Sequence, residues 1–232
     1  MKQKQAFFTV MHGRVKFMRG HYNITSDAVL LADFAAKIRV GKILDVGVGT
    51  GGAALCLLAQ SPDLQITGID VSEIMLSECA ENVKLNGQNL ELIQADIFNW
   101  KTARTFDAVI TNPPYFKGTP RQLPPCGGVA ERKQSAARCG GGQNNIHHNT
   151  DLYEWTKACL KRVRPRGYFF TIVDATAAGE VIAALQAGRA GALEIQPLFG
   201  TKNTAERVLI SARLGVKTGA KIYKGIGMKD KV

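Results

Sequence analysis

The residues best suited to chemistry in this sequence are four in a row, Asn112-Pro113-Pro114-Tyr115. They follow an apolar run over residues 106–111 that is typical of a buried strand. Two prolines cannot continue a strand ladder, so the strand must end there. The residue before a proline is pushed out of the helical region, which leaves Asn112 extended at the carboxyl end of the strand. Ligands of open α/β sheets bind at that edge.

This tetrapeptide presents hydrogen-bond acceptors suited to a planar amine. The Asn112 side chain offers an oxygen, and Pro113, which has no N–H, still offers its carbonyl. Tyr115 supplies a ring that can stack on the ring carrying the amine. Two acceptors on the hydrogens of an exocyclic amine turn its lone pair toward an electrophile. The chemistry would be N-alkylation by positioning and charge stabilisation; the alternative is a plain strand-ending turn.

A second motif, Asp45-Val46-Gly47-Val48-Gly49-Thr50-Gly51-Gly52, follows a predicted buried strand over residues 42–46. Its glycines permit a tight turn into the helix expected to about residue 60, and close approach of a ligand to the backbone. The spacing satisfies both the G-x-G-x-x-G dinucleotide pattern and the D-x-G-x-G-x-G pattern of S-adenosylmethionine enzymes. Asp45 favours the second, because a carboxylate repels a pyrophosphate and suits an ammonium or sulfonium group.

Acidic residues also follow the next two predicted strands. The strand over residues 64–69 ends at Asp70, and the strand over residues 90–94 leads to Asp96. Between them a helix is expected from its Ser72 cap to a stop at residues 86–87. An acid at the first of these strand ends accepts ribose hydroxyls in both nucleotide classes. Asp96 could equally form an Asx turn. Asp70 therefore supports a nucleoside cofactor without choosing between the two classes.

The remaining elements complete an α/β pattern over residues 1–232, read as a single domain. A lead-in, residues 1–40, contains a hairpin or extended segment over 7–18 and a helix over 27–37 that begins at Thr25 or Ser26. The loop before this helix either closes over a cofactor with hydroxyls and a carboxylate or simply caps an amphipathic helix. Later elements are predicted as a helix over 152–163, a turn over 164–167, a strand over 168–173, a helix over 177–185, and an antiparallel pair over 193–197 and 207–213.

Net charge is the strongest compositional signal. A formal charge of +11 and a pI near 9.6 favour a polyanionic partner. Basic residues cluster over 157–166 and in a tail over 217–232. A Gly- and Pro-rich segment over 117–150 carries Arg121, Arg132 and Lys133, and is expected to be a flexible loop that orders on the substrate.

Several classes are disfavoured by composition. With 45% hydrophobic residues and a mean hydropathy of −0.06, the chain has no apolar run long enough to span a bilayer and no signal-peptide core, so a cytoplasmic address is expected. Five widely spaced cysteines indicate neither a zinc site nor a disulfide framework. His147 and His148 are adjacent and usually face different ways, so no metal is expected. The oligomeric state stays open.

Taken in order, these signals resemble class I S-adenosylmethionine-dependent methyltransferases. That resemblance implies a Rossmann-like α/β fold: a seven-stranded, mostly parallel sheet with an antiparallel last strand and helices on both faces. Residues 112–115 match the [N/D/S]-P-P-[Y/F/W] motif of its amino-methyltransferases. Three features resemble the bacterial tRNA1(Val) (adenine-37-N6)-methyltransferase family: residues 24–31, Asn112-Pro113-Pro114-Tyr115-Phe116, and residues 206–210 before a basic tail. Residues 126–148 depart from that family's basic, helix-forming pattern.

The resemblance implies methylation of an adenine N6 in tRNA, at position 37 of a valine tRNA, with S-adenosylmethionine as cofactor. Asn112 and the Pro113 carbonyl would hold the amine and Tyr115 would stack on the base, while Asp96 would accept the cofactor's adenine N6 and Ile97 would pack on its ring. The implied cofactor-binding residues are Thr25, Asp27, Asp45, Gly47, Gly49, Asp70, Asp96, Ile97 and Asn112. The implied substrate-binding residues are Pro114, Tyr115, Phe116, Arg121, Arg132 and Lys133.

Other functions fit parts of the same pattern. Glutamine N5-methyltransferases of release factors or ribosomal protein also carry N-P-P-Y, but they usually have an N-terminal helical domain for which the segment before Asp45 leaves little room. Ribosomal RNA guanine N2-methyltransferases and DNA adenine methyltransferases remain open. A non-catalytic RNA-binding protein would not need Asp45, Asp70, Asp96 and Asn112 all intact. An NAD-dependent oxidoreductase would need a hydride-transfer acid or base, and no Tyr-x-x-x-Lys pair is evident.

Overall fold

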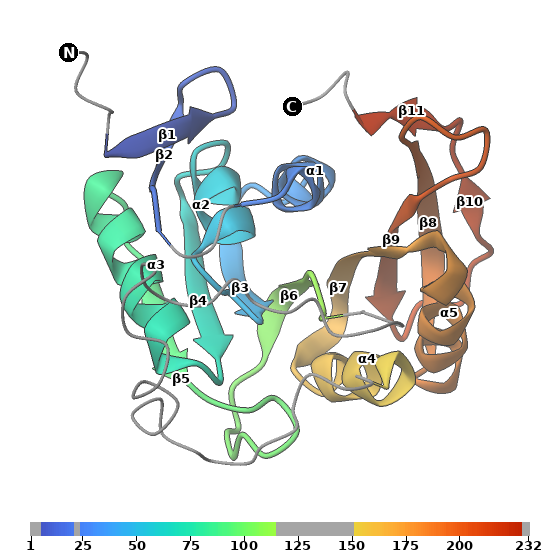
Figure 1. The fold of residues 1–232 in the computed structure, drawn as a ribbon. Coiled ribbons are helices and arrows are strands. Elements are labelled where there is room, and N and C mark those ends of the chain that lie inside the picture. The colour runs from blue at the N-terminus through green and yellow to red at the C-terminus, as the bar shows by residue number, and fades with distance from the viewer. Residues whose placement is uncertain (1–5, 21–23, 115–150, 229–232) are drawn as a thin grey trace, which may run out of the picture.

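A computed structural model describes residues 6–20, 24–114 and 151–228 (Figure 1). At its centre is a twisted sheet whose strands β3, β4, β5, β6 and β7 pair in parallel, while β9 runs antiparallel to both of its neighbours, β7 and β8. In spatial order these seven strands are β5 (Glu91–Gln94), β4 (Leu64–Asp70), β3 (Gly41–Val46), β6 (Phe106–Thr111), β7 (Val163–Asp174), β9 (Arg207–Leu214) and β8 (Ala190–Phe199). The predicted sheet, including its antiparallel last strand, is confirmed.

Alternating side chains of the sheet contribute to two hydrophobic cores, one on each face, because successive strand residues point to opposite sides. Ile43, Ile110 and Phe170 pack in the first core, which is covered by α1 (Ser26–Ala35), α2 (Gly52–Leu58) and α3 (Glu73–Leu85). Leu44 and Val109 pack in the second, which is covered by α4 (Leu152–Leu160) and α5 (Ala178–Ala187). Helices therefore cover both faces, as predicted (Figure 1). The short 3-10 helix η2 (Ala175–Ala177) joins β7 to α5.

The lead-in forms the predicted hairpin, with strands β1 (Phe7–Val10) and β2 (Val15–Met18). It lies against α3 (Figure 1), where the backbone N–H groups of Lys16 and Met18 donate to the Oδ1 atoms of Asn86 and Asn82, each at 2.8 Å. Ser72 caps α3 as predicted, because its hydroxyl accepts from the Met75 N–H at 3.3 Å. The lead-in is thereby attached to the helix that follows Asp70.

Two regions differ from expectation. The helix predicted over residues 152–163 ends at Leu160, and residues 164–167, predicted as a turn, bulge from within β7. Phe106 pairs with Val163 and Ala108 with Tyr168, so four residues of β7 stand opposite one of β6. The basic tail adds two short strands to the sheet, β10 (Lys221–Ile222) and β11 (Ile226–Gly227), both parallel to β8. The exposed edge of β8 supplies backbone partners that the local sequence of the tail does not reveal.

Within the described ranges, none of the helices is long and apolar enough to cross a membrane.

Candidate active site

The glycine turn between β3 and α2 is held against the end of β4. The N–H groups of Gly47 and Val48 both donate to the Ile69 carbonyl, at 2.9 and 3.0 Å. Gly47 and Gly49 have φ values of +73° and +53°, in the region that favours glycine. A Cβ added at Gly49 would meet nothing closer than the Gly47 carbonyl at 4.0 Å. Among the described residues the turn is thus open at Gly49, where a ligand could approach its backbone.

Asp70 connects this turn to α3. Its Oδ2 accepts from the Gly49 N–H at 2.9 Å, and its Oδ1 accepts from the Ser72 N–H at 2.9 Å. Each carboxylate oxygen can accept more than one hydrogen bond, so Asp70 keeps capacity for hydroxyls of a ligand. It is half-buried at the carboxyl end of β4, the position predicted for a ribose-binding acid.

At the next strand end, Asp96 forms an Asx turn, the alternative that the sequence left open. Its Oδ1 accepts from the Phe98 N–H at 2.9 Å, and its Oδ2 accepts from the Asn99 side-chain amide at 2.8 Å. Ile97 is buried and packs in the second core. The Asx turn leaves lone pairs on Asp96, so the roles of Asp96 and Ile97 toward an adenine ring stay predictions.

Asp45 is buried at the end of β3, with 2% of its surface exposed. Its carboxylate accepts a hydrogen bond from the Ala54 N–H, whereas Oδ2 has no hydrogen-bond partner among the described residues. Burial raises the pKa of Asp45 to about 7, and the charge of Asp70 adds to the rise although the Ala54 bond opposes it. A buried acceptor of this kind suits a nearby cation.

The strand end that carries Asn112 is tied directly to the glycine turn. Thr111, the last residue of β6, is buried, and its hydroxyl donates to the Val46 carbonyl at 2.8 Å, one residue before Gly47. Asn112 is half-buried, Pro113 buried and Pro114 exposed. The predicted amine-binding residues Asn112 and Pro113 therefore emerge beside the glycine turn.

Trp155 also reaches this strand end, a contact that the sequence did not single out. Its indole Nε1–H donates to the Thr111 hydroxyl at 3.2 Å. The ring also lies edge-to-face against Phe98, with centroids 5.8 Å apart. The only local signal was an aromatic residue in the first turns of an amphipathic helix, which is typical of ordinary core packing.

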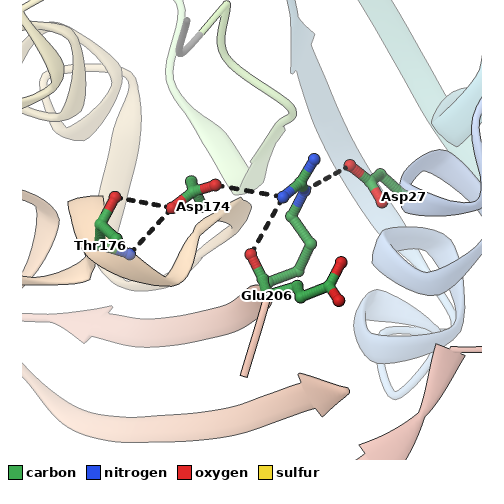
Figure 2. Close-up of polar contacts among 5 residues, drawn as sticks. Asp27, Asp174, Thr176 and Glu206 are labelled. Atoms are coloured by element: carbon green, nitrogen blue, oxygen red, sulfur yellow. Dashed lines mark hydrogen bonds and ion pairs between the residues drawn. The ribbon is translucent and has the colours of Figure 1, made fainter. Parts of the chain in front are cut away.

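Asp27 belongs to a polar network that joins α1 to β7 and β9 (Figure 2). The Arg207 guanidinium donates to Asp27 at 3.1 Å and to Asp174 at 3.2 Å, and it also donates to the Glu206 carbonyl at 3.0 Å. The Thr176 hydroxyl and N–H donate to Asp174 at 2.7 and 3.0 Å. Two segments that carried the family resemblance, 24–31 and 206–210, are thus in contact.

Thr25 is the exposed N-cap of α1, and its side chain makes no capping bond. The cofactor-binding roles of Thr25 and Asp27 stay predictions. Tyr115, Phe116, Arg121, Arg132 and Lys133 lie outside the described residues, as does the whole segment 117–150, and their predicted roles stay predictions too. Among the residues that are described, no three His, Cys, Asp or Glu side chains cluster as ligands for a metal.

A cavity of about 650 Å³ lies at the opposite, amino edge of the sheet. Its polar side chains bond to one another, because Arg104 donates to Glu91 at 2.6 Å and to Thr67 at 3.0 Å while Thr67 donates to Glu91 at 2.7 Å. These bonds hold the pKa of Glu91 down at about 2. The carboxyl edge, with its open glycine turn and an unpartnered buried carboxylate oxygen, is the better site for chemistry.

Known proteins resemble this chain over part or most of its length. A "tRNA1(Val) (adenine(37)-N6)-methyltransferase" of Phocaeicola vulgatus is 28% identical over 217 residues, covering 90% of this chain and 82% of the relative. One of Glaesserella parasuis with the same name is 34% identical over 96 residues, but the match spans only 40% of this chain and 41% of the relative.

Among solved structures, a predicted O-methyltransferase of Agrobacterium tumefaciens is 22% identical with a TM-score of 0.64, over 86% of this chain and 85% of that one. This similarity shows that the fold is that of the class I methyltransferases. The family model of the methyltransferase small domain matches residues 9–124, half of the 232-residue chain. That match takes in the glycine turn, Asp70, Asp96 and Asn112-Pro113-Pro114-Tyr115, and the chain therefore belongs to the methyltransferase small domain family.

Proposed function

We propose that this protein transfers a methyl group from S-adenosylmethionine to the exocyclic N6 of an adenine in tRNA, at position 37 of a valine tRNA. The observation that carries the proposal is the placement of Asn112 and Pro113 at the end of β6, beside the Gly47 turn. The names of two relatives, from Phocaeicola vulgatus and Glaesserella parasuis, support the choice of substrate.

The donor set of the site fits the proposed cofactor. Carboxylates at the ends of β3 and β4 and just after β5 suit hydroxyl donors and a cation, whereas they would repel a pyrophosphate. Open space at Gly49 permits close approach of a ligand to the backbone. S-Adenosylmethionine supplies an electrophilic methyl group on a sulfonium. Asp70 would bind the ribose hydroxyls, and Asp45 would stabilise positive charge from beneath the turn.

The chain's own contribution to the chemistry is orientation of the amine. The Asn112 side-chain oxygen and the Pro113 carbonyl accept hydrogen bonds from the two N–H groups of the amine. These bonds direct the lone pair of the amine toward the methyl donor. A strong base is unnecessary, since an alkylated aromatic amine sheds its extra proton readily. Burial of Pro113 holds one acceptor in a water-poor place, where electrostatic contacts are strongest. The target base must leave its stack to reach these acceptors.

Nucleoside analysis tests the function directly. The protein is incubated with labelled S-adenosylmethionine and an extract, containing tRNA and protein, of a strain lacking the gene, and the RNA and protein fractions are digested separately for mass spectrometry. The expected product is N6-methyladenosine in a valine tRNA. Labelled methylglutamine in a release factor or ribosomal protein, with the tRNA unlabelled, would move the assignment to glutamine N5 methylation.

Replacing Asp70 by alanine is expected to weaken cofactor binding by about 1.5–3 kcal/mol, the usual worth of hydrogen bonds to a charged group. Asp70 binds the turn through the Gly49 N–H and is the predicted acceptor of the ribose hydroxyls. Isothermal calorimetry with S-adenosylmethionine measures the loss, and Asp63→Ala, an exposed acid in the turn before β4, is the matched control. Calorimetry that finds NAD binding and no binding of the methyl donor would overturn the assignment.

Exposed lysines of the C-terminal segment are expected to contact tRNA phosphates. Because β10 and β11 belong to the sheet, deleting the C-terminal segment would also remove two strands. The test therefore keeps the chain length and replaces three exposed lysines, Lys217, Lys221 and Lys224, by glutamine together. Each lost phosphate contact should lower the slope of log affinity against log salt by about 0.7–0.9. A control variant carries glutamine at three other exposed lysines, Lys42, Lys84 and Lys101. Equal slopes for the two variants would exclude the C-terminal lysines from the RNA site.

A further inference from the structure

Trp155 lies where three strand ends meet. Its indole N–H donates to the Thr111 hydroxyl at 3.2 Å, and that hydroxyl donates onward to the Val46 carbonyl at 2.8 Å. One hydroxyl thus connects α4, the end of β6 and the end of β3. Asn112 follows Thr111 and Gly47 follows Val46, so the chain of hydrogen bonds spans the gap between the amine-binding residue and the glycine turn.

The ring of Trp155 packs beside the same strand ends, on the face of the sheet that carries the second core. A Cβ added at Gly47 would meet its Cζ2 and Cη2 atoms at 3.8 and 3.9 Å, which is ordinary contact distance. On its other side the ring packs edge-to-face on Phe98, which follows Asp96 and Ile97 and is 52% exposed. Trp155 therefore contacts the last residue of β6 and Phe98, four residues after β5, and its ring lies beside Gly47, the residue that follows β3.

We propose that Trp155 is a positioning residue of the methyl-transfer site. Its N–H, acting through the Thr111 hydroxyl, fixes the strand end of Asn112 against the Gly47 turn, and its ring forms a wall beside Gly47 that would shield a bound cofactor from water. The inference rests on the proposed function, since it places Trp155 between donor and acceptor sites. Methyl transfer depends on geometry, so a small displacement of Asn112 lowers the rate even when both ligands still bind.

Fluorescence tests the ring's position without measuring activity. The sequence has two tryptophans, Trp100 and Trp155. Trp100 stacks on Phe106, with centroids 6.4 Å apart, away from the glycine turn. In the Trp100→Phe variant, Trp155 is the sole emitter, and its emission is expected to change on titration with S-adenosylhomocysteine, saturating at the calorimetric Kd. In Trp155→Phe, the emission of Trp100 should stay constant over the same titration.

The outcomes separate the two proposals. If calorimetry shows binding of S-adenosylhomocysteine but the Trp155 emission does not change, the proposed position of the Trp155 ring beside the cofactor is wrong, while the proposed function stands. No binding to the wild type in calorimetry would overturn both.

Kinetics test the hydrogen-bonded chain. Trp155→Phe keeps a ring but loses the N–H, and Thr111→Val keeps the shape but loses the hydroxyl. Each is expected to lower kcat on tRNA about tenfold, the rate equivalent of one hydrogen bond, with KM for S-adenosylmethionine nearly unchanged. Because the two groups act in series, the double variant should lose little more than either single variant. Thr111→Ser should restore the rate, and Trp100→Phe should keep wild-type kcat. Wild-type kcat in Trp155→Phe, or a double-variant loss equal to the product of the single losses, would overturn the positioning role.

Discussion

Replacing Asn112 by alanine is expected to lower kcat for tRNA methylation about 10²–10³-fold, the usual result of removing one pre-positioned polar partner of a developing charge. Asn112 emerges from β6 beside the glycine turn, and its oxygen is proposed to be one of two acceptors for the target amine. Those bonds strengthen as the nitrogen gains positive charge, so the loss falls on the transition state more than on bound substrate. Single-turnover measurements with labelled S-adenosylmethionine report the chemical step.

Binding of the methyl donor should be nearly unchanged in Asn112→Ala, because most of the predicted donor contacts come from β3, β4 and the segment after β5. Asn112→Asp, which keeps an acceptor and satisfies the family motif, should retain more activity than the alanine variant. Asn89→Ala changes an exposed asparagine just before β5 and serves as the control. Wild-type turnover in Asn112→Ala would remove the basis for the mechanism.

Elements with strong local signals could be predicted from the sequence. Strand β6 has the predicted bounds, residues 106–111, because an apolar run meets two prolines that cannot extend a ladder. Helix α3 begins after its Ser72 cap and ends at the predicted Asn86-Gly87 stop, where Gly87 has a φ of +59°. The order of strands and helices, with glycines after β3, acids at or after the ends of β4 and β5, and Asn112-Pro113-Pro114 after β6, was sufficient to indicate the class I fold.

Features that depend on distant partners could not be predicted in the same way. The bulge at residues 164–167 exists because β6 and β7 pair on both sides of it, and β10 and β11 exist because β8 has a free edge. The local sequence predicts Trp155 as an ordinary core residue of α4. What distinguishes it is its hydrogen bond to Thr111, 44 residues earlier in the chain. The Arg207–Asp27 contact likewise joins residues 180 apart. Sequence patterns placed these residues on their strands and helices but did not show the contacts between them.

Burial of the Asp45 carboxyl lowers the stability of the fold at neutral pH. Burial raises the pKa of this carboxyl from its ordinary 3.8 to about 7, with Asp70 as a further, like-charged neighbour. Because the pKa of Asp45 is higher in the folded than in the unfolded state, protonation of Asp45 stabilises the folded state. This stabilisation is fully present below pH 3.8 and is lost as the pH rises through 7. Over that window the shift corresponds to about 4 kcal/mol of unfolding free energy, at 1.36 kcal/mol per pKa unit. A cation bound nearby would favour the charged form and recover part of the loss.

The affinity of the wild-type protein for S-adenosylmethionine is therefore expected to fall as the pH drops from 8 to 6, approaching tenfold per pH unit once Asp45 is largely protonated. Binding near pH 7 should release protons, which calorimetry in two buffers of different ionisation enthalpy counts. Asp45→Asn should bind more weakly at pH 8, show little pH dependence, and unfold at a higher urea concentration than wild type at pH 8. Asp63→Asn, at an exposed turn, controls for the loss of one acid. Wild-type affinity that stays flat between pH 6 and 8, with no proton released, would show that the Asp45 carboxylate does not respond to the bound cation.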